Sequence, residues 1–212
     1  GAQTGVLIKN AVALEILEKV DTLVVDKTGT LTEGKPRVIA VKNSAGWSQV
    51  ELLRLAASLE RASEHPLAAA IVRSAEEKGL ALSDVADFRS FTGQGVGGSV
   101  EGRAVLLGSP GFLENAGIHL GNVVEQADED RHAGRTAVFV AVDRKPAGLL
   151  VLADPIKQST PEAIRLLHGE RMRIVMLTGD NRRSAQAVAR ELGIDEVRGE
   201  VLPAQKGEIV KQ

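Results

Sequence analysis

The 212-residue sequence predicts one α/β domain that is interrupted by an inserted α+β domain. Three observations support this prediction. Short aliphatic runs alternate with helical patterns towards both ends of the chain, as in a sheet of parallel strands. In the middle of the chain, helical patterns and short strand patterns are instead grouped. The chain is also long enough for one large domain or two small ones, each with a buried core.

The elements of the α/β part are predicted in this order: helix Ala11–Val20, strand Thr22–Val25, strand Gly148–Ala153, helix Thr160–His168, strand Arg173–Leu177, helix Ser184–Leu192 and strand Glu196–Arg198. The helices have apolar residues at helical spacing. Pro161 lies in the first turn of one of them and Gly193 closes another. The strands before Asp26 and Thr178 are continuous apolar runs, which predicts that they are buried and parallel.

The elements of the inserted part are predicted in this order: a strand from Arg37, helices Gln49–Leu59 and Leu67–Lys78, short strands near Phe88–Phe91, Gly98–Glu101 and Ala104–Leu107, one or two helices, and strand Ala137–Val142. We therefore expect residues 1–35 and 151–212 to form the α/β domain and residues 36–150 to form the insertion. Pro155 restricts Asp154 to an extended conformation where the insertion ends. This segment and Thr32–Pro36 are expected to act as hinge strands.

The composition excludes several functional classes. The formal net charge is −2, so no basic field indicates a nucleic-acid partner. Aromatic residues make up only 2%, so aliphatic side chains must build the core. There are no cysteines, which excludes disulfides and thiolate metal sites. The apolar runs are too short to cross a bilayer, and the chain taken alone is expected to be soluble.

Asp26 is the strongest candidate for a catalytic residue. It ends a predicted strand, and in an α/β sheet ligands bind beyond the carboxyl ends of the strands. A carboxylate there can attack a phosphoryl group, provided that Mg²⁺ and a lysine offset the repulsion between the two anions. A strand-ending Asp in a turn is the alternative. The full string that begins at Asp26, DKTGTLT, is far more specific than a lone Asp.

This string resembles the phosphorylation signature of P-type ATPases, which belong to the haloacid dehalogenase superfamily. The resemblance implies that Asp26 becomes an aspartyl-phosphate, that Lys27 and Thr28 belong to the catalytic loop, and that the Asp26 side chain and the Thr28 carbonyl help to hold Mg²⁺. Related phosphatases have a second Asp two residues further on as a general acid and base. Thr28 stands there instead, so the acyl-phosphate should outlive each turnover.

A second loop, Thr178-Gly179-Asp180, also follows a predicted strand. Its hydroxyl and exposed N–H groups can bind phosphate oxygens, although a glycine turn before a helix is an equally simple interpretation. Together with the Asp26 string, it is similar to the second phosphate loop of the family. Lys206 matches the lysine of the family that neutralises phosphate, while a solvated lysine is the alternative.

A third motif, Ser63-Glu64-His65-Pro66-Leu67, resembles a box of heavy-metal P-type ATPases in which the His orients ATP. The resemblance implies that His65 contacts the nucleotide and that Glu60 contacts the adenine. A capping or packing His is the alternative, because Pro66 suits the first position of a helix.

The glycine-rich stretch from Gly93 to Gly98 satisfies the G-x-G-x-x-G pattern, but we reject a dinucleotide-binding fold. The residues that follow alternate like a hairpin instead of opening a helix. Close approach of the backbone to a nucleotide is favoured, and a glycine turn between strands is the alternative. Gly93, Gly95 and Gly108 match nucleotide-domain glycines of the family, whereas Ser109 departs from the usual Asn.

The resemblance covers essentially the whole chain. It implies a haloacid-dehalogenase-like, Rossmann-like parallel sheet, incomplete at its C-terminus, with an inserted nucleotide-binding domain. The implied ligands are Mg²⁺ and ATP or ADP. The implied partners are the transmembrane, actuator and metal-binding domains of the same pump, which this sequence lacks. The fragment is expected to be a monomer on the cytoplasmic side of a membrane and to have little ATPase activity alone.

The segments Leu23–Asp26 and Asp154–Lys157 look most like the copper(I)-exporting branch of the family. A zinc, cadmium or lead transporter is the alternative within the family. A free phosphatase of the same superfamily and a non-catalytic nucleotide-binding module are the alternatives of another class.

Overall fold

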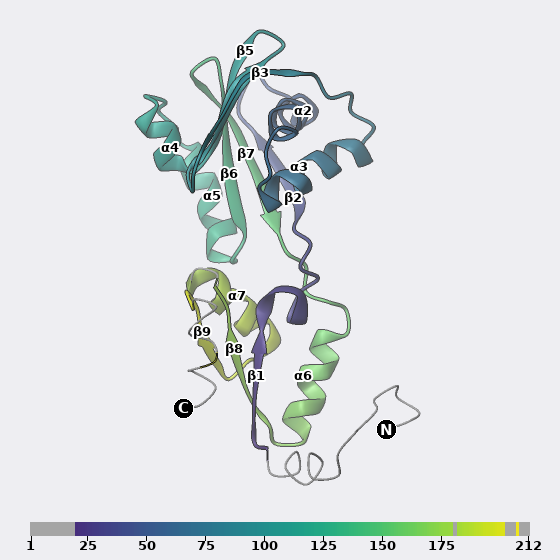
Figure 1. Ribbon diagram of the computed structural model, residues 1–212. Helices are drawn as coiled ribbons and strands as arrows, with labels where there is room; N and C mark the ends of the chain where they lie inside the picture. The colour runs from purple at the N-terminus through teal and green to yellow at the C-terminus, as the bar shows by residue number, and fades with distance from the viewer. Residues whose placement is uncertain (1–19, 180–181, 202–206, 208–212) are drawn as a thin grey trace. The chain divides into compact units, whose positions relative to one another are not determined.

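The computed structural model describes residues 20–179, 182–201 and 207 of the chain (Figure 1). The chain divides into two compact units. Unit 1 comprises Gly1–Leu31 and Lys157–Gln212, and unit 2 comprises Thr32–Ile156. The predicted helix Ala11–Val20 lies, except for its last residue, outside the described residues.

Unit 1 contains a parallel sheet with the strand order β1-β8-β9. These strands are β1 (Thr22–Asp26), β8 (Arg173–Leu177) and β9 (Glu196–Arg198). Both pairings are parallel, as the apolar runs predicted. In β8, Ile174–Leu177 are buried, but β1, which stands at one end of the strand order of the described residues, is only half-buried. The prediction that β1 is buried was therefore wrong.

The helices of unit 1 are α6 (Thr160–Gly169) and α7 (Arg182–Leu192). They follow the predicted boundaries within two residues. Gly193 has φ +69°, a conformation that glycine adopts without strain and that ends α7. Strands and helices thus alternate in unit 1, which confirms the predicted α/β class.

Unit 2 is built on a six-stranded antiparallel sheet with the order β2-β7-β6-β5-β4-β3. Its strands are β2 (Arg37–Asn43), β3 (Val85–Phe91), β4 (Gly95–Val100), β5 (Arg103–Gly108), β6 (Thr136–Val142) and β7 (Lys145–Ala153). The predicted strand Gly148–Ala153 lies in β7 and pairs antiparallel with β2 and β6, so its assignment to the α/β part was wrong. Two helices follow β2, namely α2 (Gln49–Glu60) and α3 (Pro66–Glu77), and two follow β5, namely α4 (Pro110–Asn115) and α5 (Val123–His132).

Helices cover both faces of this sheet (Figure 1). Successive side chains of β6 and β7 point to opposite faces of the sheet, so each strand contributes to both hydrophobic cores. Val140 and Leu150 pack with α2 and α3, whereas Phe139 and Leu149 pack with α4 and α5. Each of these four side chains is fully buried. Grouped helices on an antiparallel sheet confirm the predicted α+β class of the insertion.

The glycine-rich stretch forms part of a hairpin, not a helix start, which confirms that it is no dinucleotide fingerprint. Gly95 in β4 lies opposite Gly108 in β5. A Cβ atom on Gly95 would lie 2.3 Å from the carbonyl oxygen of Leu107 and 2.7 Å from the ring of Phe112. The two strands and the Phe112 ring therefore require glycine here, independently of any ligand.

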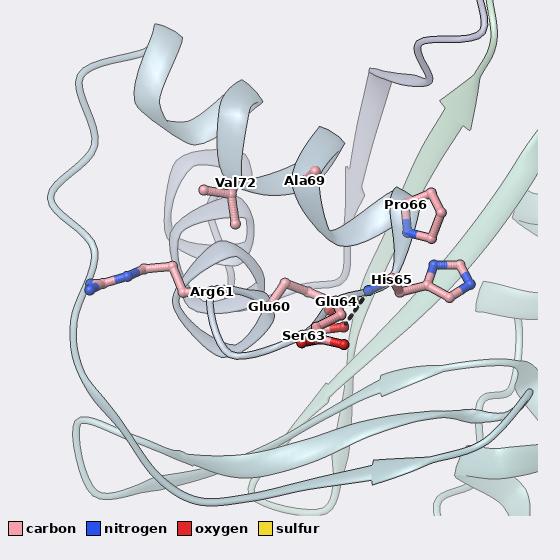
Figure 2. Close-up of a pocket in the computed structure, with 8 residues that line it drawn as sticks. All are labelled: Glu60, Arg61, Ser63, Glu64, His65, Pro66, Ala69 and Val72. Carbon is pink, nitrogen blue, oxygen red and sulfur yellow. Dashed lines mark hydrogen bonds between the residues drawn. The ribbon is translucent and has the colours of Figure 1, made fainter.

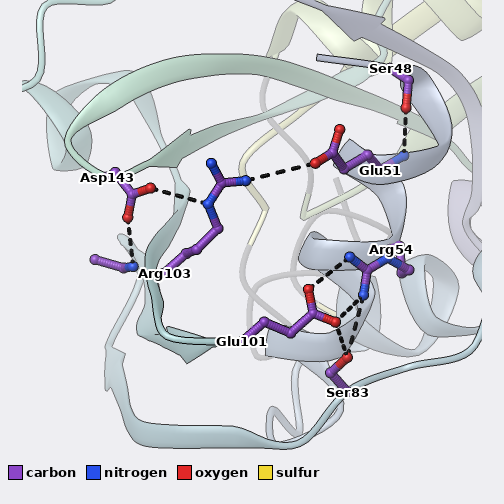
Figure 3. A network of polar contacts seen from close by, with 8 residues as sticks. Ser48, Glu51, Arg54, Ser83, Glu101, Arg103 and Asp143 are labelled. Atoms are coloured by element: carbon purple, nitrogen blue, oxygen red, sulfur yellow. Dashed lines mark hydrogen bonds and ion pairs between the residues drawn. The ribbon is translucent and has the colours of Figure 1, made fainter. Parts of the chain in front are cut away.

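A network of polar contacts ties the β4–β5 hairpin to α2 (Figure 3). Both carboxylate oxygens of Glu101 accept hydrogen bonds from Arg54, at 2.5 and 2.9 Å, and the Ser83 hydroxyl donates to one of them at 2.6 Å. Arg103 contacts Asp143 and Glu51 and stacks on the Trp47 ring at 4.8 Å. The bond from Arg54, followed by that from Ser83, lowers the pKa of Glu101 to about 2.

We expect Glu101→Gln to remove an acid-sensitive part of the stability. Because the folded state lowers the pKa of Glu101, its contribution is fully present above pH 4.5 and is lost as the pH falls towards 2. Thermal unfolding at several pH values should show a deficit of the variant at neutral pH that disappears in acid. Glu77→Gln, at the exposed end of α3, is the matched control. A deficit of Glu101→Gln that does not change with pH would contradict the expectation.

The two chain segments that lead into and out of unit 2 pair with each other. Thr32 forms an antiparallel bridge with Ile156, and its hydroxyl donates to the Asp154 carboxylate at 2.5 Å. The other oxygen of this carboxylate accepts from the backbone N–H of Lys35 at 3.0 Å. Asp154 therefore secures both segments within unit 2, while their role as hinge strands stays a prediction.

Candidate functional site

The loop after Asp26 makes a tight turn. Thr28 (φ −75°, ψ 121°) and Gly29 (φ 78°, ψ −12°) have the angles of the two central residues of a type II turn. The second position needs a positive φ, which explains the glycine. Asp26 is half-buried at the end of β1, and the Lys27 side chain is only 7% exposed.

The second motif loop follows the neighbouring strand. Asp26 lies opposite Leu177 in the parallel pairing of β1 with β8, so Thr178 comes directly after the partner of Asp26. Backbone bonds fix Thr178: its N–H donates to Arg198 and its carbonyl accepts from Val201, both at 3.0 Å. The sheet therefore brings Asp26 and Thr178-Gly179 to one edge, whereas Asp180 and Lys206 lie outside the described residues.

The donors at this edge suit Mg²⁺ better than a transition metal. Mg²⁺ prefers hard oxygen ligands and is commonly held by one or two carboxylates together with waters and substrate phosphates. Asp26 supplies a carboxylate, and the turn at Thr28 supplies a backbone carbonyl. Within the described part of the chain, no cluster of three or more His, Cys, Asp or Glu side chains could hold a metal by itself. The donor set therefore fits Mg²⁺ in the company of a phosphate.

A separate pocket lies in unit 2, between the end of α2 and the start of α3, with a volume of about 340 Å³ (Figure 2). Its lining residues are Glu60, Arg61, Ser63, Glu64, His65, Pro66, Ala69 and Val72. Pro66, Ala69 and Val72 follow each other at intervals of three, so they present one helix face to the pocket. Ser63 and Pro66 belong to the motif identified from the sequence, whereas Ala69 and Val72 were not identified there, although their helical spacing from Pro66 is visible.

Glu60 is the most unusual group of the pocket. The residue is only 6% exposed, and its Oε2 atom is buried without a hydrogen-bond partner among the described residues. Burial raises the pKa of Glu60, and a hydrogen bond with Ser63 opposes this effect. A buried acceptor without a donor costs free energy. A ligand with an N–H group could supply the missing donor.

His65 caps α3. The backbone N–H of Leu67 donates to Nδ1 of the His65 ring at 3.2 Å, and Pro66 occupies the first helical position. Because Nδ1 accepts, the proton of the neutral ring is on Nε2, which can donate to a ligand. His65 is exposed, and its ring projects from the start of α3, away from the Arg61 guanidinium (Figure 2). The two interpretations of His65 are therefore compatible: Nδ1 caps the helix, and the N–H at Nε2 is available to donate to a ligand.

The predicted nucleotide-contacting residues are not all brought together. Glu60 and His65 line one pocket, but the lining residues do not include Gly93, Gly95 or Gly108. Gly93 has φ +70° and open space around it, whereas Gly95 and Gly108 are packed against each other and against Phe112. Ser109, where Asn is usual, caps α4 by accepting a hydrogen bond from the Phe112 N–H at 3.3 Å.

In the described part of the chain, no helix is long and apolar enough to span a bilayer. A family model of haloacid dehalogenase-like hydrolases matches residues 20–212. The copper-exporting P-type ATPase of Legionella pneumophila is 51% identical over 212 residues, covering 100% of this chain and 29% of that protein. The silver exporting P-type ATPase of Salmonella typhimurium is 49% identical over 210 residues, covering 99% and 26%.

Among solved structures, a zinc-transporting PIB-type ATPase in its E2.Pi state matches this fold with a TM-score of 0.86 and 39% identity, over 99% of this chain and 34% of that chain. The chain thus spans about a quarter to a third of the length of the proteins that it matches. The family match covers all of the described residues, and its range includes both motif loops. The chain belongs to the haloacid dehalogenase-like hydrolase family.

Proposed function

We propose that the chain is the ATP-binding and phosphorylation region of a P-type ATPase that exports a heavy-metal cation, with an aspartyl-phosphate at Asp26. The strongest support is the parallel pairing of β1 with β8, which aligns Asp26 with Leu177 and makes the two motif loops neighbours. Most of the length of such a pump would lie outside this sequence, since the chain corresponds to less than a third of the relatives named above. Unit 1 would be its phosphorylation domain on the cytoplasmic side of the membrane.

In the proposed reaction, a carboxylate oxygen of Asp26 attacks the γ-phosphorus of ATP. A bond forms between phosphorus and this oxygen, the bond to the bridging oxygen of ADP breaks, and ADP leaves. Mg²⁺ would neutralise charge on the phosphoryl oxygens, with the Asp26 carboxylate and the Thr28 carbonyl among its donors. Thr178, Gly179 and Lys206 would bind the phosphoryl oxygens, and Lys27 and Asp180 complete the proposed catalytic set.

Unit 2 would bind the nucleotide. The buried Oε2 of Glu60 needs a donor, and the exocyclic amino group of adenine is one. The N–H at Nε2 of His65 would donate to the same ATP molecule. The turn at Gly93 would allow the backbone to approach the ATP molecule. Gly95 and Gly108, on two closely packed strands, remain proposed contacts of the nucleotide.

We propose Cu(I) as the exported ion. The two relatives described above, each about half identical to this chain, are named as copper and silver exporters. Cu(I) and Ag(I) are both soft monovalent ions and share a preference for sulfur ligands. The zinc-transporting structure is less similar in sequence, at 39% identity, and zinc remains the alternative.

Calorimetric titration of the chain with ATP tests the nucleotide site, and the pH dependence tests Glu60. Burial raises the pKa of Glu60, so part of the folded protein carries a neutral Glu60 just above pH 4.5. An N–H donor from adenine favours the ionised form, so we expect affinity for ATP to rise as the pH rises through the folded pKa of Glu60. Glu60→Gln should bind ATP about tenfold more weakly at neutral pH.

ATP itself also changes protonation with pH, and Glu60→Gln controls for this effect. The variant should keep the pH dependence of ATP affinity that comes from ATP and lose only the part that comes from Glu60. The same variant should be more stable than the parent at neutral pH. A raised folded pKa gives Glu60 a contribution that is present below pH 4.5 and is lost as the pH rises. Equal ATP affinity of parent and variant at every pH would exclude Glu60 from the site.

Rapid hydrolysis of a simple phosphate ester by the chain with Mg²⁺ would instead favour the alternative function, a free phosphatase.

A further inference from the structure

Lys157 holds the loop that follows Asp26. Its Nζ atom donates to the Gly29 carbonyl at 2.6 Å, across 128 positions of the sequence. Its backbone N–H donates to the Leu31 carbonyl at 3.0 Å, and the Thr160 hydroxyl donates to the same carbonyl at 2.9 Å. Two hydrogen bonds from Lys157, just before α6, and one from Thr160, its first residue, thus secure residues 29–31, and all the groups involved belong to unit 1.

The bond to Gly29 acts where the loop has the most conformational freedom. Glycine has the widest range of backbone angles, and Gly29 is at φ 78°, the second central position of the turn. The peptide before Gly29 carries the Thr28 carbonyl, and the peptide after it carries the carbonyl that Lys157 holds. With the second peptide fixed, rotation about Gly29 is restricted, so the direction of the Thr28 carbonyl is restricted too.

The positive charge of Lys157 is not neutralised by a carboxylate among the described residues, and it lies next to the loop that follows Asp26. Within the described residues, Lys157 has a backbone carbonyl as its side-chain partner and no ion pair with a carboxylate. The residue as a whole is half-buried, but its hydrogen bond to Gly29 is exposed to water. A cationic donor also makes a stronger hydrogen bond than a neutral one.

We propose that Lys157 is a positioning residue for the phosphorylation reaction: it holds the turn at Gly29 and so keeps the Thr28 carbonyl in the orientation in which it would help to hold Mg²⁺. This proposal rests on the proposed function. Groups that orient the ligands of a metal without binding it commonly change metal affinity or activity by 10–100-fold when they are removed. Lys157 would act in this way, because it contacts the Gly29 carbonyl, which is next to the Thr28 carbonyl proposed as a donor to Mg²⁺.

The first test needs neither metal nor activity. Hydrogen–deuterium exchange of the metal-free chain is measured for a peptide that covers residues 27–31, in the parent and in Lys157→Met. The Met side chain has similar length but no donor, so we expect exchange in this segment to become about tenfold faster. Lys145→Met, on an exposed residue at the start of β7, is the matched control and should not change this segment.

The second test uses the full-length pump and labelled ATP. We expect Lys157→Met to need about ten times more Mg²⁺ for half-maximal phosphorylation, and Lys157→Arg to restore most of the loss. ATP affinity of unit 2 should be unchanged. Lys157→Gln, which is too short to reach Gly29, gives a second variant if Lys157→Met does not fold.

The outcomes separate the two proposals. A parent protein that forms no phosphoenzyme would overturn the proposed function and the role of Lys157 with it. A parent that is phosphorylated, with Lys157→Met showing the same Mg²⁺ requirement and the same exchange, would overturn the role of Lys157 alone. A variant that exchanges faster but needs no more Mg²⁺ would also overturn it, because the bond would then be purely structural.

Discussion

Asp26→Asn in the full-length protein is expected to abolish the acid-stable phosphoenzyme. The Asn amide has nearly the same shape as the carboxylate but lacks its charge and is a much poorer nucleophile, so the new bond to phosphorus cannot form. The measurement is incorporation of label from γ-labelled ATP in the presence of Mg²⁺, followed by acid precipitation. Incorporation should fall to the background level.

The control variant for this change is Asp21→Asn. Asp21 is exposed just before β1, and its backbone carbonyl accepts a hydrogen bond from Arg173 at 2.7 Å, which the substitution leaves in place. It should retain full labelling. Asp26→Asn should still bind ATP with unchanged affinity, because the nucleotide pocket belongs to unit 2. Label that persists in Asp26→Asn would exclude Asp26 as the phosphorylated residue.

The second large effect is expected at His65. His65→Ala removes both the cap of α3 and the proposed donor at Nε2, so stability should fall by about 1 kcal/mol and ATP affinity by about tenfold or more. Thermal unfolding measures the first loss, and calorimetry with ATP measures the second.

His65→Asn separates the two roles. The side-chain oxygen of Asn is a good cap for the N-terminus of a helix, but Asn has no imidazole that could reach the ligand. We therefore expect the stability to be recovered and the ATP affinity to remain low. If His65→Asn recovers both, His65 is only a cap, and the resemblance of its motif to an ATP-binding box would not carry over to this chain.

The local elements were largely predictable because they depend on short-range patterns. Continuous apolar runs indicated β1 and β8, helical spacing indicated α2 and α3, and the residues after Gly95 alternated as strands do. The predicted boundaries of the insertion were residues 36 and 150, whereas the compact units meet at residues 31 to 32 and 156 to 157. The difference arises because Thr32 and Ile156 pair across the segments and extend unit 2 at both ends.

The sequence by itself predicted phosphoryl chemistry at the Asp26 loop, offered a helix cap as one interpretation of His65, and determined the order of the elements, because each depends on neighbours within a few residues. The tertiary structure alone decided that β1 pairs with β8, that a Glu60 oxygen is buried without a partner, that Gly95 faces Gly108 beneath Phe112, and that Lys157 holds Gly29. These features require segments far apart in the sequence to meet, and their free energy comes from burial and close packing, which no local pattern encodes.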